Sequence, residues 1–343
     1  MPEPVIQIRR GPLFTQTGVR ISGTGCCLAD KVVTNEDLAR LGCDAEWIIQ
    51  RTGIRERRHA PEGVTTGTLS TVAGSRAIEA SGIDPSAIDL VLLATFTPDR
   101  LMPQTATRVQ SDLGLNCPAM DVVAACAGFM YALLTGVQFV ATGAARNVLV
   151  IGADTNTRVL DPDDKKTFPL FGDGAGAVVV SPGRTDQGVL AGTLGADGLG
   201  TDLLTRRMGG AELPFVVNAA RDADGRTPWL MEMEGRPVFK WAVRLLEDTF
   251  EHVLTAAGRD RDQVKLWLLH QANARILDAA TDAMGVPRER VVKHLDRYGN
   301  TSAASIPVAL DESLRSGAIE PGDELLMCGF GAGLSWGTAL WKW

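Results

Sequence analysis

The strongest constraint on the fold is one order of secondary-structure elements that recurs in the two halves of the 343-residue chain. Short apolar runs, such as residues 91–95, indicate buried strands, and segments of helical length alternate with them. Corresponding elements lie roughly 160 to 177 residues apart, which is too long a period for a solenoid. The sequence therefore predicts an α/β fold made of two similar halves, residues 1–184 and residues 185–343.

The expected elements are the same in kind and order in both halves, although the residue identities barely repeat. In the first half they are helix 68–80, strand 90–95, helix 105–113, strand 119–124, helix 127–142 and strands 147–152 and 175–181. In the second half they are helix 238–257, strand 265–270, helix 274–284, strand 289–294, helix 303–315 and strands 324–329 and 335–342. Such alternation is typical of buried sheets that are covered by helices.

In each half one expected helix begins with small and apolar residues only, AGFMYALL at 127–134 and AASIPVAL at 303–310. Such helices are expected inside the molecule. A helix N-terminus gathers unpaired N–H groups and partial positive charge, so it suits a thiolate or an oxyanion. Cys126 precedes the first helix and Asn300 lies ahead of the second. We therefore expect the two residues to face each other across one pocket.

Composition and charge exclude several classes of protein. The 34 basic and 41 acidic residues give a net charge of −7, which argues against a general nucleic-acid binder. No apolar run reaches the ~18 residues of a membrane helix, and the N-terminal residues show no signal-peptide core. The six cysteines, without an export signal, predict reduced thiols in a cytoplasmic protein. With four histidines and no CxxC, His-x-His or HExxH motif, no metal site is expected.

Cys126, His270 and Asn300 are the candidate catalytic residues. Cys126 lies between a strand and a buried helix, whose N-terminus lowers the pKa of a thiol and favours the nucleophilic thiolate. His270 ends an expected strand and opens a polar HQAN run, at the sheet edge where α/β proteins place active sites. Asn300 follows a glycine turn and either caps a helix or donates its amide to a carbonyl oxygen. Because papain-type hydrolases also combine Cys, His and Asn, the residue types alone leave the reaction open.

A glycine-rich segment, residues 329–334, follows one expected strand and precedes another. No helix is expected after it, so this context excludes a nucleotide-phosphate loop. A tight turn that brings backbone N–H groups to a substrate oxygen fits the segment better. A second glycine-rich segment, residues 171–176, is expected to support the same pocket.

Taken together, these segments resemble the β-ketoacyl-acyl carrier protein synthase III family of the thiolase-like superfamily. The matching stretches are DAEWI at 44–48, RTGIRER at 51–57, AACAGF at 124–129, FGDGAG at 171–176, HQANAR at 270–275, GNTSAAS at 299–305 and FGAG at 330–333. They follow the family's order and spacing through residues 17–343. The resemblance implies a five-layer αβαβα fold built from a duplicated α/β unit, and a homodimer.

The resemblance implies a decarboxylative condensation that starts fatty-acid or polyketide synthesis. Cys126 would take an acyl group from acyl-CoA, and malonyl-acyl carrier protein would then lose CO₂ and attack the acyl-cysteine. A neutral His270 and Asn300 would stabilise the enolate oxygen. The N–H groups of Cys126 and Ala332 would hold the oxyanion, provided that Ala332, where the family more often has glycine, tolerates its backbone angles. Acyl-CoA is a substrate here, so no cofactor is expected.

The resemblance also assigns residues to CoA. Trp47 would stack on the adenine, Arg51 and Lys165 would lie near phosphates, and Asn273 would lie near the pantetheine arm. Lys165 stands where the family has arginine, and lysine makes a point-charge contact but not a bidentate one. Without the resemblance, Trp47 is better explained by core packing and Arg51 by a solvated basic face.

Three residues are assigned in the same way to the docking of an acidic carrier protein, namely Gln271, Arg275 and Lys240. Met102 stands where a bacterial relative has phenylalanine in the acyl pocket, and its flexible side chain would admit a branched, longer or unusual primer. Residues 199–232 match the family least and are expected to shape the entrance.

The main alternative keeps the fold and Cys126 but transfers the acyl group to a pathway-specific acceptor, as some secondary-metabolism relatives do. The presence of both His270 and Asn300 favours condensation, because simple acyl transfer needs no group that stabilises decarboxylation. A non-catalytic partner subunit would lack the nucleophile. A hydrolase would pair the thiol with an imidazole and an activated water, and the repeated architecture argues against it.

Overall fold

The computed structural model describes residue 8 and residues 10–215 and 229–343, and the fold is α/β as expected. Within these residues two five-stranded sheets form the framework. The first sheet consists, in spatial order, of β2 (Val19–Leu28), β8 (Gly174–Pro182), β7 (Val148–Asp154), β5 (Leu90–Ala94) and β6 (Ala119–Val122). Strand β5 is parallel to β6 and β7, whereas β8 is antiparallel to β7 and β2.

The second sheet repeats this pattern. Its spatial order is β1 (Leu13–Thr17), β9 (Gly188–Ala196), β14 (Ser335–Lys342), β13 (Glu324–Gly331) and β12 (Val264–Leu269). Strand β12 is parallel to β13, and the other neighbours are antiparallel. Strands β9, β14, β13 and β12 thus correspond to β2, β8, β7 and β5. Strand β1, from the start of the chain, joins this second sheet beside β9.

One expected strand does not form. Residues 289–294, the counterpart of β6, contribute only an isolated bridge between Val291 and Trp267, and η7 (Arg288–Arg290) occupies the start of the segment. The Gln271 side chain occupies backbone groups that would otherwise hydrogen-bond to a neighbouring strand. Its amide donates to Val292 O at 3.0 Å and accepts from His294 N at 3.1 Å. The residues of the segment by themselves could not reveal this competition, because Gln271 lies outside it.

Two long strands, β2 and β9, were not among the expected elements. Glycine and threonine interrupt both runs, VRISGTGCCL and GVLAGTLGA, so neither has the pattern of a continuous apolar strand. Their glycines permit close packing of a helix on the strand: a Cβ on Gly25 would lie 2.6 Å from Ala73 O. Tertiary packing of α2 therefore requires residues that weaken the local strand signal.

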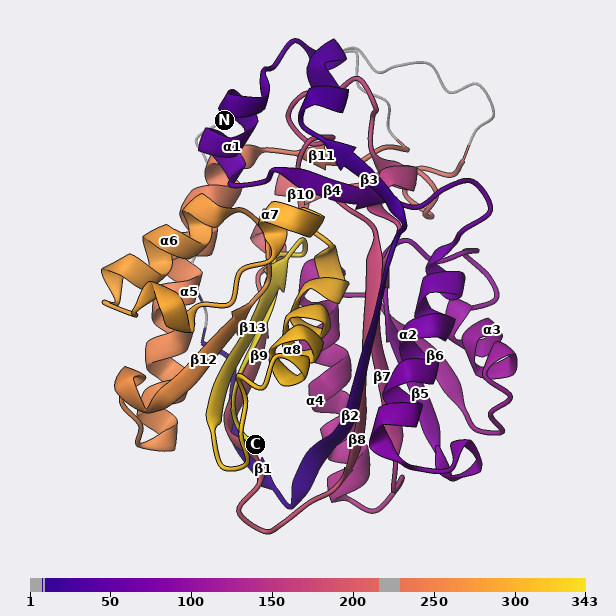
Figure 1. The fold of residues 1–343 in the computed structure, drawn as a ribbon, viewed down its shortest axis with the longest axis vertical. Coiled ribbons are helices and arrows are strands. Elements are labelled where there is room, and N and C mark those ends of the chain that lie inside the picture. The colour runs from indigo at the N-terminus through magenta and orange to yellow at the C-terminus, as the bar shows by residue number, and fades with distance from the viewer. Residues whose placement is uncertain (1–7, 9, 216–228) are drawn as a thin grey trace.

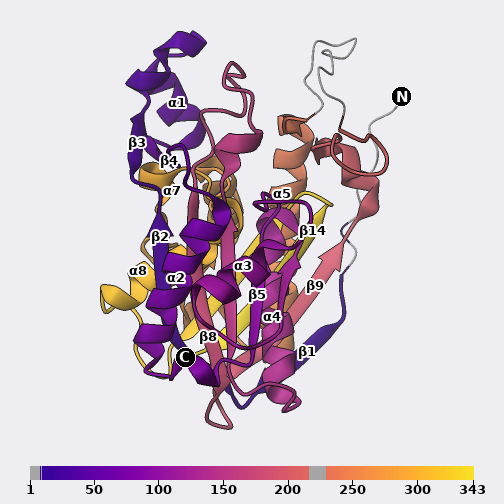
Figure 2. The same cartoon turned by 90° about the vertical axis from the view of Figure 1, so that its right-hand side faces the viewer.

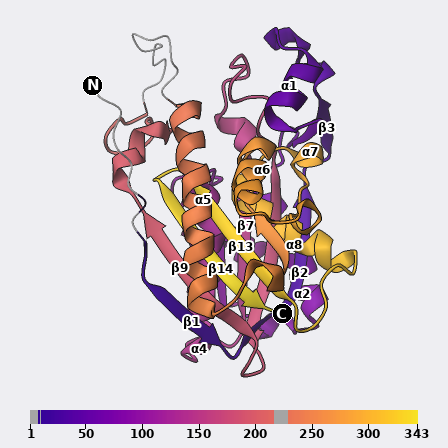
Figure 3. The same ribbon diagram turned by 90° about the vertical axis from the view of Figure 1, so that its left-hand side faces the viewer.

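Helices and sheets stack in five layers, αβαβα (Figure 1). The outer helices of the first sheet are α2 (Thr66–Ser81) and α3 (Thr105–Asp112), which Figure 2 shows in front of that sheet. The outer helices of the second sheet are α5 (Gly235–Ala257) and α6 (Ala274–Ala283), seen from their side in Figure 3. Helices α4 (Gly128–Ala141) and α8 (Ser305–Arg315) lie between the sheets and contact both.

The central helices are the ones whose sequences predicted burial. Helix α4 is buried on most of its circumference, and one hydrophobic cluster joins its side chains to strands of both sheets. Burial on both sides leaves little room: a Cβ on Gly136 would lie 3.0 Å from Val150 Cγ2. The two halves are therefore parts of one packed core rather than separately folded units.

The remaining elements complete one end of the molecule. They are α1 (Ala45–Thr52), α7 (Leu295–Tyr298), the hairpin of β3 (Lys31–Thr34) and β4 (Glu56–His59), and the short pair β10 (Leu204–Thr205) and β11 (Glu232–Met233). Short 3₁₀ helices connect the larger elements: η1 (Glu36–Leu41), η2 (Pro85–Ala87), η3 (Ala125–Ala127), η4 (Asn156–Val159), η5 (Gly198–Leu203), η6 (Arg261–Gln263) and η8 (Ser302–Ala304). No helix in the described residues combines the length and apolar character needed to cross a membrane.

Candidate active site

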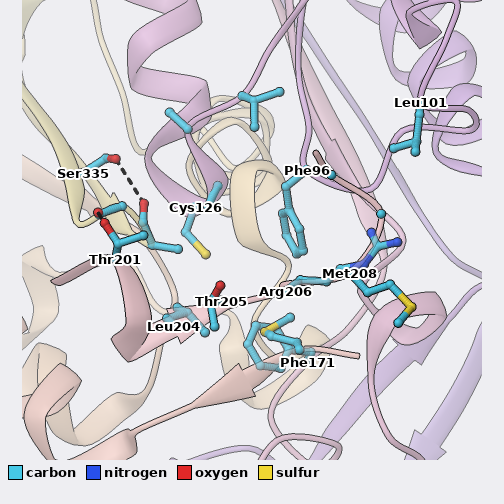
Figure 4. Close-up of a pocket in the computed structure, with 18 residues that line it drawn as sticks. Phe96, Leu101, Cys126, Phe171, Thr201, Leu204, Thr205, Arg206, Met208 and Ser335 are labelled. Carbon is cyan, nitrogen blue, oxygen red and sulfur yellow. Dashed lines mark hydrogen bonds between the residues drawn. The ribbon is translucent and has the colours of Figure 1, made fainter. Parts of the chain in front are cut away.

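Cys126 lies at the buried start of a central helix. It belongs to η3, which leads directly into α4, and its side chain is 6% exposed. The preceding residue, Ala125, has a φ of 45°, which sharpens the turn between β6 and the helix. Figure 4 shows the Cys126 sulfur pointing into a cavity.

That cavity has a volume of about 500 Å³, the size of a small-molecule site. Its wall is mostly apolar and comes from both halves of the chain. The side chains around the sulfur include Phe96, Leu101, Val123, Phe171, Leu204, Met208, Met231 and Ala332. A hydrophobic cavity that ends at a thiol can hold an acyl chain next to the nucleophile.

Ser302 connects the two halves at this point. Its hydroxyl donates to Cys126 Sγ at 3.3 Å, although 176 residues separate the two. Its backbone N–H donates to Asn300 Oδ1 at 2.8 Å. Because that oxygen is occupied, the NH₂ group of Asn300 is the part of the amide left to donate to a substrate. The starts of α4 and of η8, which leads into α8, therefore meet as the repeat predicted.

His270 follows β12 and is 2% exposed. Its Nδ1 lies 3.2 Å from Ser305 Oγ, and its ring packs edge-on against Phe330 with centroids 5.2 Å apart. The Ser302 backbone is close enough to the ring to raise its pKa, so the ring lies beside the residue that contacts Cys126 and Asn300. Burial lowers the pKa of His270 to about 3, so the ring is neutral at physiological pH and donates as an uncharged group.

The thiol does not have the low pKa that a helix N-terminus led us to expect. Burial raises the pKa of the Cys126 thiol to about 12, and the nearby Asp154 carboxylate raises it further, while the hydrogen bond from Ser302 lowers it. Desolvation of the charged form outweighs the helix dipole here. The resting Cys126 side chain is therefore a neutral thiol, and its proton would have to leave before the sulfur could act as a nucleophile.

The glycine-rich turn after β13 packs directly on the nucleophile. A Cβ at Gly331 would lie 2.8 Å from Cys126 Cβ and 3.0 Å from its backbone nitrogen. Ala332, the next residue, lines the same cavity as Cys126. The φ angle of Ala332 is not positive. Alanine therefore tolerates the backbone angles at this position, where the family more often has glycine.

Three of the four residues assigned to CoA lie together at one end of the molecule. The Arg51 guanidinium lies 5.5 Å from the centroid of the Trp47 ring, and both residues belong to α1. Asn273, the N-cap of α6, donates its amide to Arg51 O at 3.2 Å. Trp47 is 39% exposed, so part of its ring remains accessible to a ligand rather than packed in the core.

Lys165, the fourth of these residues, is exposed in the loop between η4 and β8. Arg40 ties this loop to η1, just ahead of α1, because it donates to Asp163 Oδ1 at 2.8 Å and to Pro162 O at 2.7 Å.

The docking residues divide into two exposed cations and one buried amide. Lys240 is exposed on α5, and Arg275 is exposed on α6 with its guanidinium 5.8 Å from the Phe239 ring centroid. The assignment of Gln271 to docking is wrong, because this residue is 0% exposed. Its amide donates to Leu269 O and Val292 O, so it organises the backbone next to His270 instead.

Met102 does not line the cavity of its own chain. Its side chain is 86% exposed, and its neighbour Leu101 is the one that contributes to the wall. Residues 199–215 and 229–232, the described parts of the divergent segment, supply Thr201, Leu204, Thr205, Arg206, Met208 and Met231 to the wall. The arginines at 221 and 226 lie outside the described residues.

Sequence reasoning missed two polar residues of the site, Ser302 and Asp154. Asp154 ends the otherwise apolar strand β7 and is 0% exposed. The sequence signal for Asp154 was a single carboxylate at the carboxyl end of a buried strand. A buried carboxylate needs hydrogen-bond donors from the fold, and such strand ends are where α/β proteins place active sites. Ser302 carried no signal beyond its place in the GNTSAAS run.

A buried thiol, a neutral imidazole and a free amide donor beside an apolar cavity define an acyl-transferring enzyme of thiolase-like fold. Comparisons with known proteins show the family to which the chain belongs. Residues 120–198 match the family model of 3-oxoacyl-[acyl-carrier-protein (ACP)] synthase III, and residues 254–343 match the model of its C-terminal part. The chain is 50% identical over 344 residues to the beta-ketoacyl-[acyl-carrier-protein] synthase III of Rhodopirellula baltica, with 95% of this chain and 99% of that protein covered.

Comparison with solved structures leads to the same family. The 3-oxoacyl-[acyl-carrier-protein] synthase III of Aquifex aeolicus is 40% identical with a TM-score of 0.86, covering 95% of this chain and 100% of that one. The priming β-ketosynthase of the R1128 polyketide pathway is 34% identical with a TM-score of 0.86, covering 99% and 98%. The chain therefore belongs to the 3-oxoacyl-[acyl-carrier-protein] synthase III family, and it is an acyltransferase of the condensing type.

Proposed function

We propose that this enzyme condenses an acyl-CoA primer with malonyl-acyl carrier protein, releases CO₂ and so initiates fatty-acid synthesis. The observation that carries the proposal is the cluster around Ser302, which lies next to Cys126, His270 and Asn300, together with the apolar cavity that Cys126 lines. In the first half-reaction the Cys126 sulfur attacks the thioester carbonyl, an acyl-cysteine forms and CoA leaves. The N–H groups of Cys126 and Ala332 hold the oxyanion of this step.

In the second half-reaction the malonyl thioester oxygen accepts hydrogen bonds from His270 and from the amide of Asn300. Loss of CO₂ places negative charge on that oxygen, and two uncharged donors in a dry site stabilise it without first forming an ion pair. The carbanion then attacks the acyl-cysteine and gives the 3-oxoacyl product. These two half-reactions need no metal and no organic cofactor.

The surface near the site suits both thioester donors. Trp47, Arg51 and Asn273 offer an aromatic face, a cation and an amide for CoA, and Lys165 adds a point charge. For the carrier protein, α5 and α6 present a basic stripe of four exposed cations, Arg236, Lys240, Arg244 and Arg275. The three cations on α5 are four residues apart and share one face of the helix, which suits an acidic partner.

A second candidate is the same condensation in a polyketide pathway. The structural likeness to a priming β-ketosynthase favours it, because priming uses the same two half-reactions with another primer. The two candidates differ in the acyl-CoA that loads Cys126. Transfer of the acyl group to an alcohol or amine acceptor is less favoured, because such a reaction has no decarboxylation step for His270 and Asn300 to stabilise.

Intact-mass spectrometry with a panel of acyl-CoAs tests the nucleophile and reveals the primer. The wild type is expected to gain the mass of one acyl group and to lose it on addition of malonyl-acyl carrier protein. Cys126→Ala is expected to gain no mass, because the thiol is gone. Cys117→Ala, a half-buried cysteine away from the cavity, is the control and should label normally. Labelling of Cys126→Ala would refute the nucleophile.

We propose that the enzyme is a homodimer that pairs along β6. This strand is one of the two edge strands of the first sheet, and the apolar side chains of Leu101, Met102, Met120 and Val123 are exposed beside it. An exposed sheet edge with apolar side chains invites pairing with a second copy. Since Met102 does not line the cavity at Cys126, its assigned role in the acyl pocket requires the cavity of a partner subunit.

Analytical ultracentrifugation of Met120→Glu tests this interface. A charge on β6 is expected to shift the protein from dimer to monomer, because the glutamates of two copies would be desolvated together. Leu13→Glu is the matched control, as Leu13 is 40% exposed on the edge strand β1 of the other sheet, while Met120 is 38% exposed. A wild type that sediments as a monomer contradicts the proposal.

We also propose a cytoplasmic location. All six cysteines are free, which suits a reducing compartment. The thiol of Cys126 has to stay reduced in order to accept an acyl group. Fractionation of the producing cells, with detection of the protein in the membrane-free extract, tests this location.

A further inference from the structure

A buried carboxylate lies next to the nucleophile and has no role in the mechanism so far. Asp154 is 0% exposed at the end of β7. Its Oδ1 accepts from the hydroxyls of Thr95 and Thr97, both at 2.9 Å, and from the N–H groups of Phe96 and Thr97 at 3.0 and 3.2 Å. In residues 10–215 and 229–343 no arginine or lysine forms an ion pair with it. The fold thus supplies neutral donors that hold a carboxylate without a cation.

The second oxygen of Asp154 faces the catalytic cluster. Oδ2 accepts from Ala303 N at 3.3 Å, and the neighbouring Ser302 hydroxyl is close enough to lower the pKa of the carboxyl group. The same hydroxyl lies 3.3 Å from Cys126 Sγ. One hydroxyl carries one proton, so it can donate to the sulfur or to the carboxylate but not to both at once. When it donates to Asp154, its oxygen is left to accept the proton of the Cys126 thiol.

Charge balance favours a shared proton over two ions. A thiolate and a carboxylate side by side would place two negative charges in a buried site, and Asp154 indeed raises the pKa of Cys126. Moving the thiol proton to Asp154 leaves a single negative charge, now on the sulfur at the start of α4. The donor from Ser302 then points at the thiolate, which it stabilises.

We propose that Asp154 accepts the Cys126 proton through the Ser302 hydroxyl when the acyl group is transferred, an inference that rests on the proposed acyl-cysteine chemistry. The S–H bond of Cys126 breaks as its proton moves to Ser302 Oγ, and the Ser302 proton moves to Asp154. The sulfur forms its bond to the acyl carbon, and CoA leaves as a thiolate with the electron pair of the broken C–S bond.

The return step closes the cycle. When the carbanion attacks the acyl-cysteine, Cys126 leaves as a thiolate, and the proton on Asp154 returns to it through Ser302. Ser302 touches the reacting sulfur and is a catalytic residue, whereas Asp154 acts through Ser302 and is a positioning residue. The proton count is restored without any group beyond the three side chains.

The relay has a defined pH window. Burial raises the pKa of Asp154 to about 6, although hydrogen bonds from Ser302 and the β5 end oppose this. Of the groups that face Asp154, the β5 end gives threonine hydroxyls, β8 gives Gly174 and η3 gives Cys126. The His270 ring beyond Ser302 is neutral. Below about pH 6 Asp154 is already protonated, so the relay loses its acceptor.

Alkylation of Cys126 by iodoacetamide tests the relay without any substrate. The rate is followed between pH 5 and pH 9 by mass spectrometry of the peptide that contains Cys126. In the wild type the rate is expected to rise through an inflection near pH 6. Ser302→Ala and Asp154→Asn are each expected to abolish that inflection and to slow alkylation at pH 7 by on the order of 10²-fold. The double variant should be no slower than either single variant, because both act on one path.

Two controls separate the relay from a structural effect. Ser302 has a φ of 52°, so Ser302→Gly removes the hydroxyl while relaxing the backbone, and it should behave like Ser302→Ala. Ser313→Ala removes a buried hydroxyl elsewhere in α8 and should leave the profile unchanged. Thermal unfolding of each variant reports on its folding.

An unchanged pH profile in folded Ser302→Ala, or an inflection near pH 6 that persists in Asp154→Asn, overturns the proposal. The proposed function fails separately, when acyl-CoA does not load the wild-type enzyme. In that case the alkylation profile still reports on the relay.

Discussion

At the scale of single residues, burial decides the protonation states of the site. Burial raises the pKa of the Cys126 thiol to about 12 and lowers the pKa of His270 to about 3, so both side chains rest in their neutral forms. A papain-type hydrolase needs a thiolate paired with an imidazolium. In this structure the nearest polar partner of the sulfur is the Ser302 hydroxyl, and His270 Nδ1 lies against Ser305 instead. These contacts favour condensation over hydrolysis.

His270→Ala is expected to retain acylation of Cys126 and to reduce CO₂ release from malonyl-acyl carrier protein by about 10²–10³, since one oxyanion donor is lost. The wild-type decarboxylation rate should show no inflection from His270 between pH 5.5 and 8, because the pKa of this ring is about 3 and it stays neutral throughout. Radiolabelled CO₂ release measures both. His252→Ala, on the outer helix α5, is the control. Normal decarboxylation by His270→Ala would count against its role.

At the scale of elements, the site depends on how closely a strand turn approaches a helix start. The end of β13 packs so closely on η3 and the start of α4 that Gly331 has no room for a side chain and Gly329 has little. A Cβ on Gly329 would lie 3.1 Å from Met130 Cγ, and one on Gly331 would lie 2.8 Å from Cys126 Cβ. The glycine-rich segment thus brings the backbone of the β13–β14 turn against Cys126, and its role in presenting N–H groups to a substrate oxygen stays a prediction.

Gly331→Ala is expected to lower the rate of Cys126 acylation by about 10²-fold, because the added methyl group displaces the sulfur relative to the oxyanion donors. Stopped-time mass spectrometry with the preferred acyl-CoA measures this rate. Gly235→Ala, at the start of α5, is the control, since its Cβ would meet nothing nearer than Met233 Cε at 3.9 Å. Equal acylation rates for Gly331→Ala and the wild type would show that the close contact does not position the sulfur.

At the scale of the whole molecule, the two halves share one core, and the site lies where they meet. A Cβ on Gly152 in β7 would lie 2.2 Å from Ala303 O, so the first sheet touches the start of the second central helix without any side chain between them. Thr24 Oγ1 donates to Asp311 Oδ1 at 2.8 Å in the same buried interface. Since neither half can be moved without breaking such contacts, the enzyme should unfold as one unit.

Gly152→Ala is expected to lower the free energy of unfolding by about 1–3 kcal/mol, because the methyl group overpacks the interface between the halves. Urea unfolding followed by fluorescence and by circular dichroism measures this, and the two signals should coincide in one transition. Gly198→Ala is the control: nothing lies within 4 Å of its Cβ, so the change should stay within about 0.5 kcal/mol. Two separate transitions in the wild type would contradict a shared core.

The sequence predicted the parts of this protein that local patterns encode. The apolar run 91–95 and the small, apolar helix after Cys126 were recognisable because full burial requires them. The segment 289–294 was misassigned, since the Gln271 amide, from 21 residues upstream, takes a carbonyl that a strand would have used. The resemblance misassigned Gln271 to docking, because a matching motif position does not show whether the side chain is exposed or buried among backbone partners.

The order of residues by itself predicted the duplicated α/β fold and singled out three candidate catalytic side chains, because periodicity and residue chemistry are local properties of the chain. Tertiary structure alone decided their protonation and their neighbours. The pKa of Cys126 depends on how much water the folded core excludes, and its contact with Ser302 joins residues 176 positions apart. Desolvation and close approach exist only after the two halves have packed, so no local pattern could have placed Asp154 beside the thiol.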